Sequence, residues 1–233
     1  MTTALPVYLA QVDYLLSADN DELAAVARSE IAEAAIERYS HDKPDIITVD
    51  VTGDGGKFYA ITTSLTKWSE GFSQIVRIEY PAPTVASDEA PTLLEPDDYD
   101  DNYWDGSTRY LYLPNHAPAA TEALRVRYTA PYTATNGAYD IPAADFHAVC
   151  QLAAGLCAQA IAAKYSRSSD STIAADSVNH LERSERWAAR AREFIRLYEQ
   201  FVGVDAESGK EQPAGEFVDW DTAPRNKARW LYH

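Results

Sequence analysis

The chain has 233 residues, with 20 Lys and Arg against 36 Asp and Glu, so its formal net charge is −16 at pH 7. A chain this acidic is a poor partner for nucleic-acid phosphates or for an anionic membrane surface, because both are held by Lys and Arg. Its 46% of hydrophobic residues is enough for a buried core, which excludes disorder of the whole chain. The length fits one large domain or two modules.

The two cysteines, Cys150 and Cys157, are too few for a disulfide framework. On one predicted helix they would lie about 10 Å apart along its axis, too far for a bridge, so we expect two reduced core thiols. The longest apolar stretch, residues 149–163, is alanine-rich and interrupted by two glutamines, so we expect no membrane span. Residues 1–16 lack the basic start of a signal peptide, and we expect a soluble protein made in the cytoplasm.

Residues 1–42 are predicted to form two helices. Residues 6–16 make a short amphipathic helix, followed by a turn rich in helix-capping residues (SADND). In the second helix Leu23, Ala27, Ile31 and Ala34 recur three or four residues apart, which indicates a helix packed on one side. Two helices this short need further packing partners to be stable.

Residues 43–135 change to the alternating pattern of strands. Residues 46–52 (IITVDVT) and 57–62 (KFYAIT) flank the sequence GDGG, which is typical of a hairpin turn. Further strands are expected at residues 74–80, 109–113 and 122–129, each followed by proline. The spacing favours a small antiparallel sheet or barrel inserted between two helical halves, with residues 82–108 as a long loop.

Residues 136–202 return to a helical pattern. One long helix is expected to open at Pro142, because proline is tolerated in a first turn, and its many alanines allow a neighbouring helix to approach closely. The last helix, from about residue 179, carries Trp187 and Tyr198 on an apolar face and alternating Arg and Glu on the other. The predicted fold is α+β, with a discontinuous helical core (residues 1–42 and 136–202), an antiparallel β-rich insertion (43–135) and an extended C-terminal arm (203–233).

The sequence holds no enzyme motif that we can identify. It contains no GxSxG, P-loop, HExxH or dinucleotide-binding GxGxxG motif. The GDGG run joins two predicted strands and opens no helix, so we interpret it as a turn. The five histidines are scattered without ligand spacing. We therefore expect no catalytic residue, no metal site and no cofactor.

Acidic and aromatic residues gather at residues 88–108, where no Lys or Arg occurs. The members are Asp88, Glu89, Glu95, Asp97, Asp98, Asp100, Asp101 and Asp105, with Tyr99, Tyr103 and Trp104 among them. We favour a solvated loop whose aromatic side chains anchor it to the sheet. Two alternatives stay open: a calcium loop, because hard cations bind carboxylate oxygens, and a sugar-binding surface. The sequence does not exclude a pair of carboxylates for glycoside hydrolysis, because their separation is a spatial property, but nothing in it singles out such a pair.

The C-terminal arm ends in a basic and aromatic segment. Large aromatic side chains are costly to leave in water, so we expect this arm to dock on another subunit or a partner in preference to its own domain. The residues expected to make this contact are Phe217, Trp220, Arg225, Lys227, Arg229, Trp230, Leu231 and Tyr232.

The order of these elements resembles that of the head–tail connector (adaptor) proteins of long-tailed bacteriophages. The resemblance rests on the sequences AAIERY at 34–39, IPAAD at 141–145 and SDSTIAADS at 169–177. The phrases DVTGDGG, GFSQIVRIEYP and VRYTAPYT are also similar to those of phage head and neck proteins. The similarity covers nearly the whole chain up to Val202, and the β-rich insertion departs from the smallest connectors.

The resemblance implies a structural virion protein of the neck, and not an enzyme. Such adaptors form a ring, usually of twelve copies, beneath the portal protein; their C-terminal arms reach the portal, and the opposite face receives the tail or a stopper or terminator protein. DNA would pass through the ring without specific binding, which an acidic channel favours by repelling phosphates. The alternative function is a ligand-binding module for carbohydrate or calcium that uses residues 88–108.

A ring needs contacts between neighbouring copies, and the charged face of the last helix is suited to them. The candidates for this ring interface are Glu182, Arg183, Glu185, Arg186 and Arg190.

Overall fold

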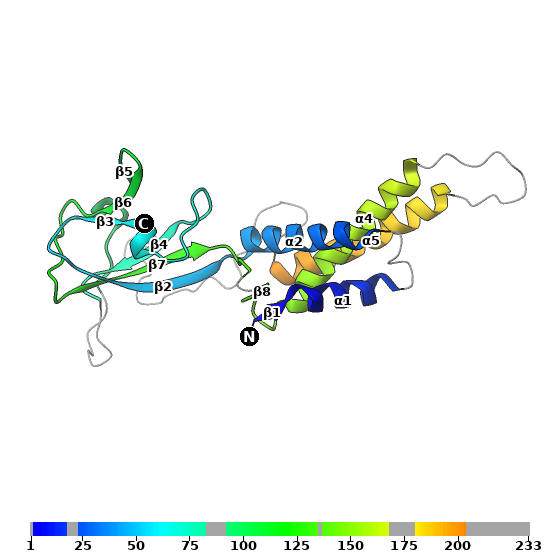
Figure 1. Cartoon of the computed structure of the whole chain (residues 1–233), viewed down its shortest axis with the longest axis horizontal. Helices are drawn as coiled ribbons and strands as arrows, with labels where there is room; N and C mark the ends of the chain where they lie inside the picture. The colour runs from blue at the N-terminus through cyan, green and yellow to red at the C-terminus, as the bar shows by residue number, and fades with distance from the viewer. Residues whose placement is uncertain (1, 18–22, 83–91, 135–136, 168–179, 204–233) are drawn as a thin grey trace, which may run out of the picture. The chain divides into compact units, whose positions relative to one another are not determined.

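The computed structural model of the chain describes residues 2–17, 23–82, 92–134, 137–167 and 180–203. The fold is α+β, and its helices and strands are drawn in Figure 1. Contacts divide the chain into two compact units, one of residues 1–35 with 141–233 and one of residues 36–140. The sequence-based boundaries lie at residues 42/43 and 135/136. The first observed border, between residues 35 and 36, instead falls inside the helix of residues 25–42.

The helical unit contains β1 (Thr3–Ala4), α1 (Leu5–Leu16), the first part of α2 (Ala25–Asp42), α4 (Phe146–Arg167) and α5 (His180–Val202). The bounds of α1 and α5 agree with the sequence prediction. Pro6 lies in the first turn of α1, where its missing N–H leaves no hydrogen bond unmade. Figure 1 shows α4 and α5 side by side, and α4 also packs against α1.

The long helix does not open at Pro142 as predicted but begins at Phe146. The Asp145 amide donates to the Pro142 carbonyl oxygen in a turn, at 2.9 Å. The first bond of helical spacing runs from the Val149 amide to the Asp145 carbonyl oxygen, at 3.1 Å. The three residues after Pro142 therefore form a turn that precedes the helix.

The interior of α4 is buried on most sides. Cys150 and Cys157 are both free and fully buried, as predicted, and burial raises their pKa values to about 12 and about 11. By length and composition α4 could cross a membrane, contrary to the sequence expectation, and no other helix in the described residues could. However, 61% of its most apolar stretch is buried within the protein, which is also the pattern of a core helix.

The β-rich unit contains two three-stranded antiparallel sheets. One has the order β2 (Asp45–Thr52), β7 (Ala123–Ala130), β4 (Ile75–Glu79). The other has the order β3 (Phe58–Ala60), β6 (Thr108–Tyr112), β5 (Asp100–Asp105). Residues of both sheets build one core, which includes Val51 of β2, Leu111 of β6 and Val126 of β7. The unit also holds the short helix α3 (Ile61–Ser64), the 3-10 turn η2 (Pro96–Asp98) and β8 (Ala138–Tyr139).

The predicted hairpin around GDGG is wrong. β2 pairs with β7 and β3 pairs with β6, so the two strands that flank the turn belong to different sheets. The turn packs instead on the segment before β7, where the Gly53 amide donates to the Glu122 carbonyl oxygen at 2.9 Å. A Cβ atom at Gly53 would stand 2.4 Å from the carbonyl oxygen of Ala119, so only glycine fits this approach. The second predicted strand also ends early, because α3 begins at Ile61.

The prediction of one long loop at residues 82–108 is also wrong in part. Residues 83–91 lie outside the described residues, but residues 100–105 form β5, which pairs with β6. Glu95 and Asp98 bracket η2 and cap it reciprocally, the Glu95 side chain accepting from the Asp98 amide and the Asp98 side chain from the Glu95 amide. Much of the acid-rich segment is therefore regular structure.

Candidate interaction face on helix α5

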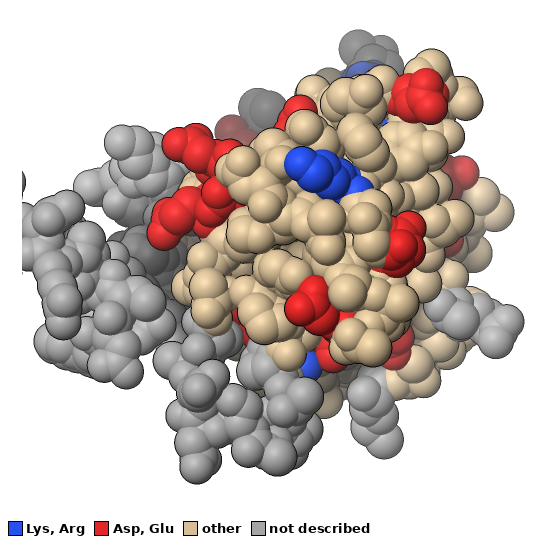
Figure 2. Space-filling model, turned by 90° about the vertical axis from the view of Figure 1, so that its left-hand side faces the viewer, with Lys and Arg blue, Asp and Glu red and all other residues tan. Residues whose placement is uncertain are grey.

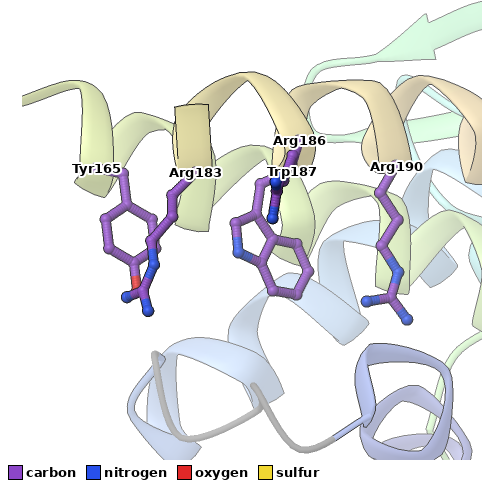
Figure 3. Close-up of a pocket in the computed structure, with 5 residues that line it drawn as sticks. All are labelled: Tyr165, Arg183, Arg186, Trp187 and Arg190. Atoms are coloured by element: carbon purple, nitrogen blue, oxygen red, sulfur yellow. The ribbon is translucent and has the colours of Figure 1, made fainter. Parts of the chain in front are cut away.

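Helix α5 gathers three arginines on one side. Arg183, Arg186 and Arg190 are spaced three and four residues apart, so they share a face with Trp187. Arg192 and Arg196 fall on the opposite side at 3.6 residues per turn. Figure 3 shows Arg183, Trp187 and Arg190 extending from α5 in one direction, beside Tyr165 from α4. We call the set of Tyr165, Arg183, Arg186, Trp187 and Arg190 the arginine face.

These five side chains line a cavity of about 330 Å³. Trp187 is 8% exposed and Tyr165 is 7% exposed, so the aromatic rings form a buried floor. Arg183 and Arg186 are exposed at its rim. The cavity therefore combines an apolar floor with cationic walls, a combination suited to a carboxylate or an acidic segment of a partner.

Arg183 is held in place by Tyr165. Its Nη1 atom donates to the Tyr165 hydroxyl at 3.2 Å, and its guanidinium carbon lies 5.5 Å from the centre of the tyrosine ring. A cation over an aromatic face is attracted by the ring quadrupole. The hydrogen bond uses one of five guanidinium N–H groups, so the others remain able to bind a partner.

Arg186 pairs with Glu182 one turn earlier on the same helix. Both side chains are well exposed, 75% for Arg186 and 51% for Glu182. An exposed pair of this spacing contributes only about 0.3–0.5 kcal/mol to stability, so a partner's carboxylate can replace Glu182 at small cost.

The contacts of Arg190 lie within the chain itself. Its guanidinium donates to the carbonyl oxygens of Leu15 and Leu16, at 3.4 Å for Leu16, and to the Ser17 hydroxyl at 3.3 Å. The last turn of α1 contains no basic residue, so Arg190 supplies the cation that satisfies its free carbonyls. It also lies over the ring of Trp187, at 5.2 Å. Arg190 therefore connects α5 to the C-terminal end of α1.

The predicted ring-interface residues are thus divided by the structure. Arg183 and Arg186 line the cavity with exposed guanidinium groups, and Glu182 lies beside them as the partner of Arg186. Glu185 is exposed but does not line the cavity. The predicted portal-contacting residues of the arm, from Phe217 to Tyr232, lie outside the described residues.

Sequence reasoning missed two parts of this face. Tyr165 was not singled out, although it lies at the end of the apolar stripe of α4 and could have been found by extending that stripe by one turn. The contact of Arg190 with the end of α1 joins residues 174 positions apart, and no local pattern in the sequence indicates it.

The acidic residues of the 88–108 segment do not form a metal site in the described part of the chain. No group of three or more His, Cys, Asp or Glu side chains there is placed to hold a metal ion. Asp101 lies 3.8 Å from Arg109, which also pairs with Glu70 at 2.8 Å. The Asp100 side chain accepts a hydrogen bond from the Asn102 amide at 2.8 Å. Several of these carboxylates thus serve their own loops and strands.

Comparison with models of protein families, with curated proteins and with solved structures finds no match to this chain. The functional conclusion therefore rests on the residues and on the geometry of the arginine face.

Proposed function

We propose that the chain is a head-to-tail adaptor of a bacteriophage virion, which forms a ring under the portal, joins capsid to tail and leaves a channel for DNA. The observation that carries this proposal is the exposed arginine face of α5, where Arg183 and Arg186 stand over an aromatic floor. A closed ring uses heterologous contacts, in which one surface of each copy meets a different surface of the next. The arginine face provides one such surface.

The charge of the chain supplies the complementary surface. Acidic residues exceed basic ones by 36 − 20 = 16, whereas α5 carries five arginines and four glutamates. A carboxylate-bearing surface of the neighbouring copy would therefore be attracted to the arginine face. Desolvated arginine–carboxylate pairs give such contacts orientation as well as affinity.

The net charge also suits a DNA conduit. On the face drawn in Figure 2 carboxylates recur over the surface, whereas Lys and Arg are sparse. Such a surface repels phosphates, so DNA would slide past it without being held. Tight binding of duplex DNA by the isolated chain at low salt would contradict this part of the proposal.

The test is the assembly state of the full-length chain, alone and mixed with portal protein, measured by native mass spectrometry and electron microscopy. We expect closed rings in one or both conditions. The double variant Arg183→Glu with Arg186→Glu should lose them, because like charges would then face each other across the contact. The matched control is Arg192→Glu with Arg196→Glu, which reverses the same charge on the opposite side of α5 and should assemble normally.

A second variant separates ring formation from portal binding. Replacing Trp220, Trp230 and Tyr232 by alanine should abolish binding to the portal and leave contacts between copies unchanged. A wild-type chain that stays monomeric both alone and with portal would refute the proposal. Equal loss of assembly in the two charge-reversal pairs would show that the arginine face is not the contact between copies.

A further inference from the structure

One face of the β3–β6–β5 sheet carries a cluster of four aromatic rings, of which two are exposed and two are half-buried. Phe58 pairs with Tyr112 across β3 and β6, and Tyr103 pairs with Tyr110 across β5 and β6. Residues that pair across strands, and residues two apart along a strand, share a face. All four rings therefore lie on the same side of the sheet. The other side carries Tyr59 and Leu111, which are buried in the core.

The rings hold one another in place. The rings of Phe58 and Tyr112 are stacked at 4.7 Å with an interplanar angle of 14°, and Tyr103 lies 5.0 Å from Phe58. Each such contact contributes about 0.5–1.5 kcal/mol, so the cluster is ordered before any ligand binds. Phe58 is nevertheless 44% exposed and Tyr103 is 41% exposed. Ordered aromatic faces are thus presented to solvent.

The cluster borders a cavity of about 210 Å³ lined by Phe58, Tyr103, Tyr110 and Asp105. Asp105 lies two residues after Tyr103 on β5, so it is on the same face of the sheet, and its side chain is exposed. The cavity therefore offers apolar ring faces, two phenolic hydroxyls and one carboxylate within the space of a single six-membered ring.

This combination matches the chemistry of a sugar ring. One face of a pyranose consists of C–H groups whose partial positive charge is attracted to the negative face of an aromatic ring. Its edge carries hydroxyls. A carboxylate accepts strong hydrogen bonds from them, and tyrosine hydroxyls can both donate hydrogen bonds to them and accept hydrogen bonds from them.

Single-stranded nucleic acid also stacks on aromatic platforms, but it needs a positively charged groove for its phosphates. Here β5 carries Asp100, Asp101 and Asp105, and the nearby Arg109 is already paired with Asp101 and Glu70. The charge therefore disfavours any anionic ligand, nucleic acids and acidic sugars included.

We propose that the aromatic face of the β3–β6–β5 sheet is a binding site for a neutral carbohydrate, with Phe58 and Tyr103 stacking on a sugar ring and Asp105 accepting hydrogen bonds from its hydroxyls. From the sequence alone, a sugar-binding surface at residues 88–108 is one of two alternatives to a solvated acidic loop. The geometry moves the site to the strands and brings in Phe58 and Tyr110 from outside that segment. Among the acidic residues of the run that the structure describes, Asp105 lines the cavity. The proposal is independent of ring assembly.

The test is titration of the full-length chain with maltohexaose, cellohexaose, mannohexaose and chitohexaose, followed by saturation-transfer NMR and calorimetry. We expect at least one of these to bind with a Kd of about 1 mM or tighter. Tyr103→Ala should weaken that binding about 10-fold, and Asp105→Asn by about fivefold. Circular dichroism and the melting temperature of each variant show that the fold is kept.

The chain offers matched controls for both substitutions. Trp104 is also an exposed aromatic residue of β5, but it pairs with Arg109 and so points to the other face; Trp104→Ala should leave sugar binding unchanged. Asp97→Asn removes an exposed carboxylate of η2 outside the cavity and should also have no effect.

Two results would overturn the proposal. One is the absence of binding by all four oligosaccharides at about 10 mM. The other is equal weakening of sugar binding by Tyr103→Ala and Trp104→Ala. If the oligosaccharides fail and the aromatic rings become protected when copies assemble or portal binds, the face is a protein contact and the carbohydrate proposal is wrong.

Discussion

Gly155 of α4 lies so close to Ile195 of α5 that a Cβ atom on the glycine would stand 2.8 Å from Ile195 Cγ1. The same atom would stand 3.3 Å from the carbonyl oxygen of Ala191. Gly155→Ala should gain about 1 kcal/mol of helix propensity, but overpacking costs about 1–3 kcal/mol. We expect a net loss of about 1 kcal/mol in the free energy of unfolding, measured by urea denaturation.

Two further variants isolate the cause. Ala163→Gly, at an exposed position of the same helix, measures the propensity term alone and should cost about 1 kcal/mol. Ile195→Ala removes the atom that would clash, so Gly155→Ala should cost less in that background than in the wild type. A wild-type chain that becomes more stable on Gly155→Ala would show that the helices are not in close contact at this point.

Arg190 should matter to stability in a way that its neighbours on α5 do not. Arg190→Met keeps the apolar stem over Trp187 but removes the donors to the carbonyls of Leu15 and Leu16. Hydrogen bonds from a charged group contribute about 1–2 kcal/mol net, and we expect thermal unfolding to show a loss of that size. Arg192→Met is the control, because Arg192 is exposed and donates to the Ala188 carbonyl in the preceding turn of its own helix, α5. Similar losses for both variants would contradict the role given to Arg190.

Local pattern predicted the elements of this fold better than their pairing. The apolar stripe with Trp187 and Tyr198 placed α5 within a residue of its observed bounds. The alternation of residues 46–52 correctly indicated a strand, but alternation says which face is buried and not which strand lies alongside. β2 pairs with β7, which is some 75 residues away along the chain, and glycines typical of a hairpin favoured the nearer partner.

The acid-rich strand β5 could not have been found from composition. Its sequence, DDNYWD, holds three aspartates and an asparagine, which are depleted in strands. It lies at the edge of its sheet, where charged side chains remain in water and discourage pairing with other chains. Of the two candidate sites, one could be predicted from local spacing and the other could not. Spacing on α5 placed Arg183 and Arg186 on one face, whereas only the paired strands bring Phe58 to Tyr103.

The ion pair between Asp50 of β2 and Arg125 of β7 should make stability depend on acid pH. Arg125 donates to both carboxylate oxygens, at 2.7 and 2.9 Å, and these bonds lower the pKa of Asp50. The stabilisation is therefore complete above the ordinary Asp pKa of about 4 and is lost as the pH falls through the lowered value.

The size of this effect is limited because the Asp50 side chain is half exposed to solvent. After allowance for solvent screening we expect about 0.5 kcal/mol. Asp50→Asn should reduce stability at neutral pH by this amount and flatten the profile below about pH 4. Asp97→Asn, at an exposed turn, should leave the profile unchanged. The measurement is the melting temperature as a function of pH, and identical profiles for wild type and Asp50→Asn would refute the prediction.

At alkaline pH the corresponding group is Tyr80, whose hydroxyl donates to Glu122 Oε2 at 2.6 Å. This bond, aided by desolvation, raises the pKa of Tyr80 to about 12 and lowers the pKa of Glu122. A raised pKa gives stabilisation that is complete below the unfolded value of about 10 and is lost as the pH rises through about 12. The lowered pKa of Glu122 gives stabilisation that is complete above about 4.5 and lost in acid.

Ultraviolet titration of tyrosinate in the folded protein should therefore show a late-titrating tyrosine near pH 12 that is missing in Tyr80→Phe. Glu122→Gln removes the charged acceptor, so the same tyrosine should titrate closer to 10 in that variant. Glu122 also accepts a hydrogen bond from the Ala119 amide at 2.9 Å, so Glu122→Gln weakens this second bond too. The melting temperature of Glu122→Gln is therefore compared with that of Tyr80→Phe. If the late titration persists in Glu122→Gln, burial and not the hydrogen bond is its main cause. Glu122→Gln should then lose stability between pH 10 and 12, and Tyr80→Phe should not show this loss.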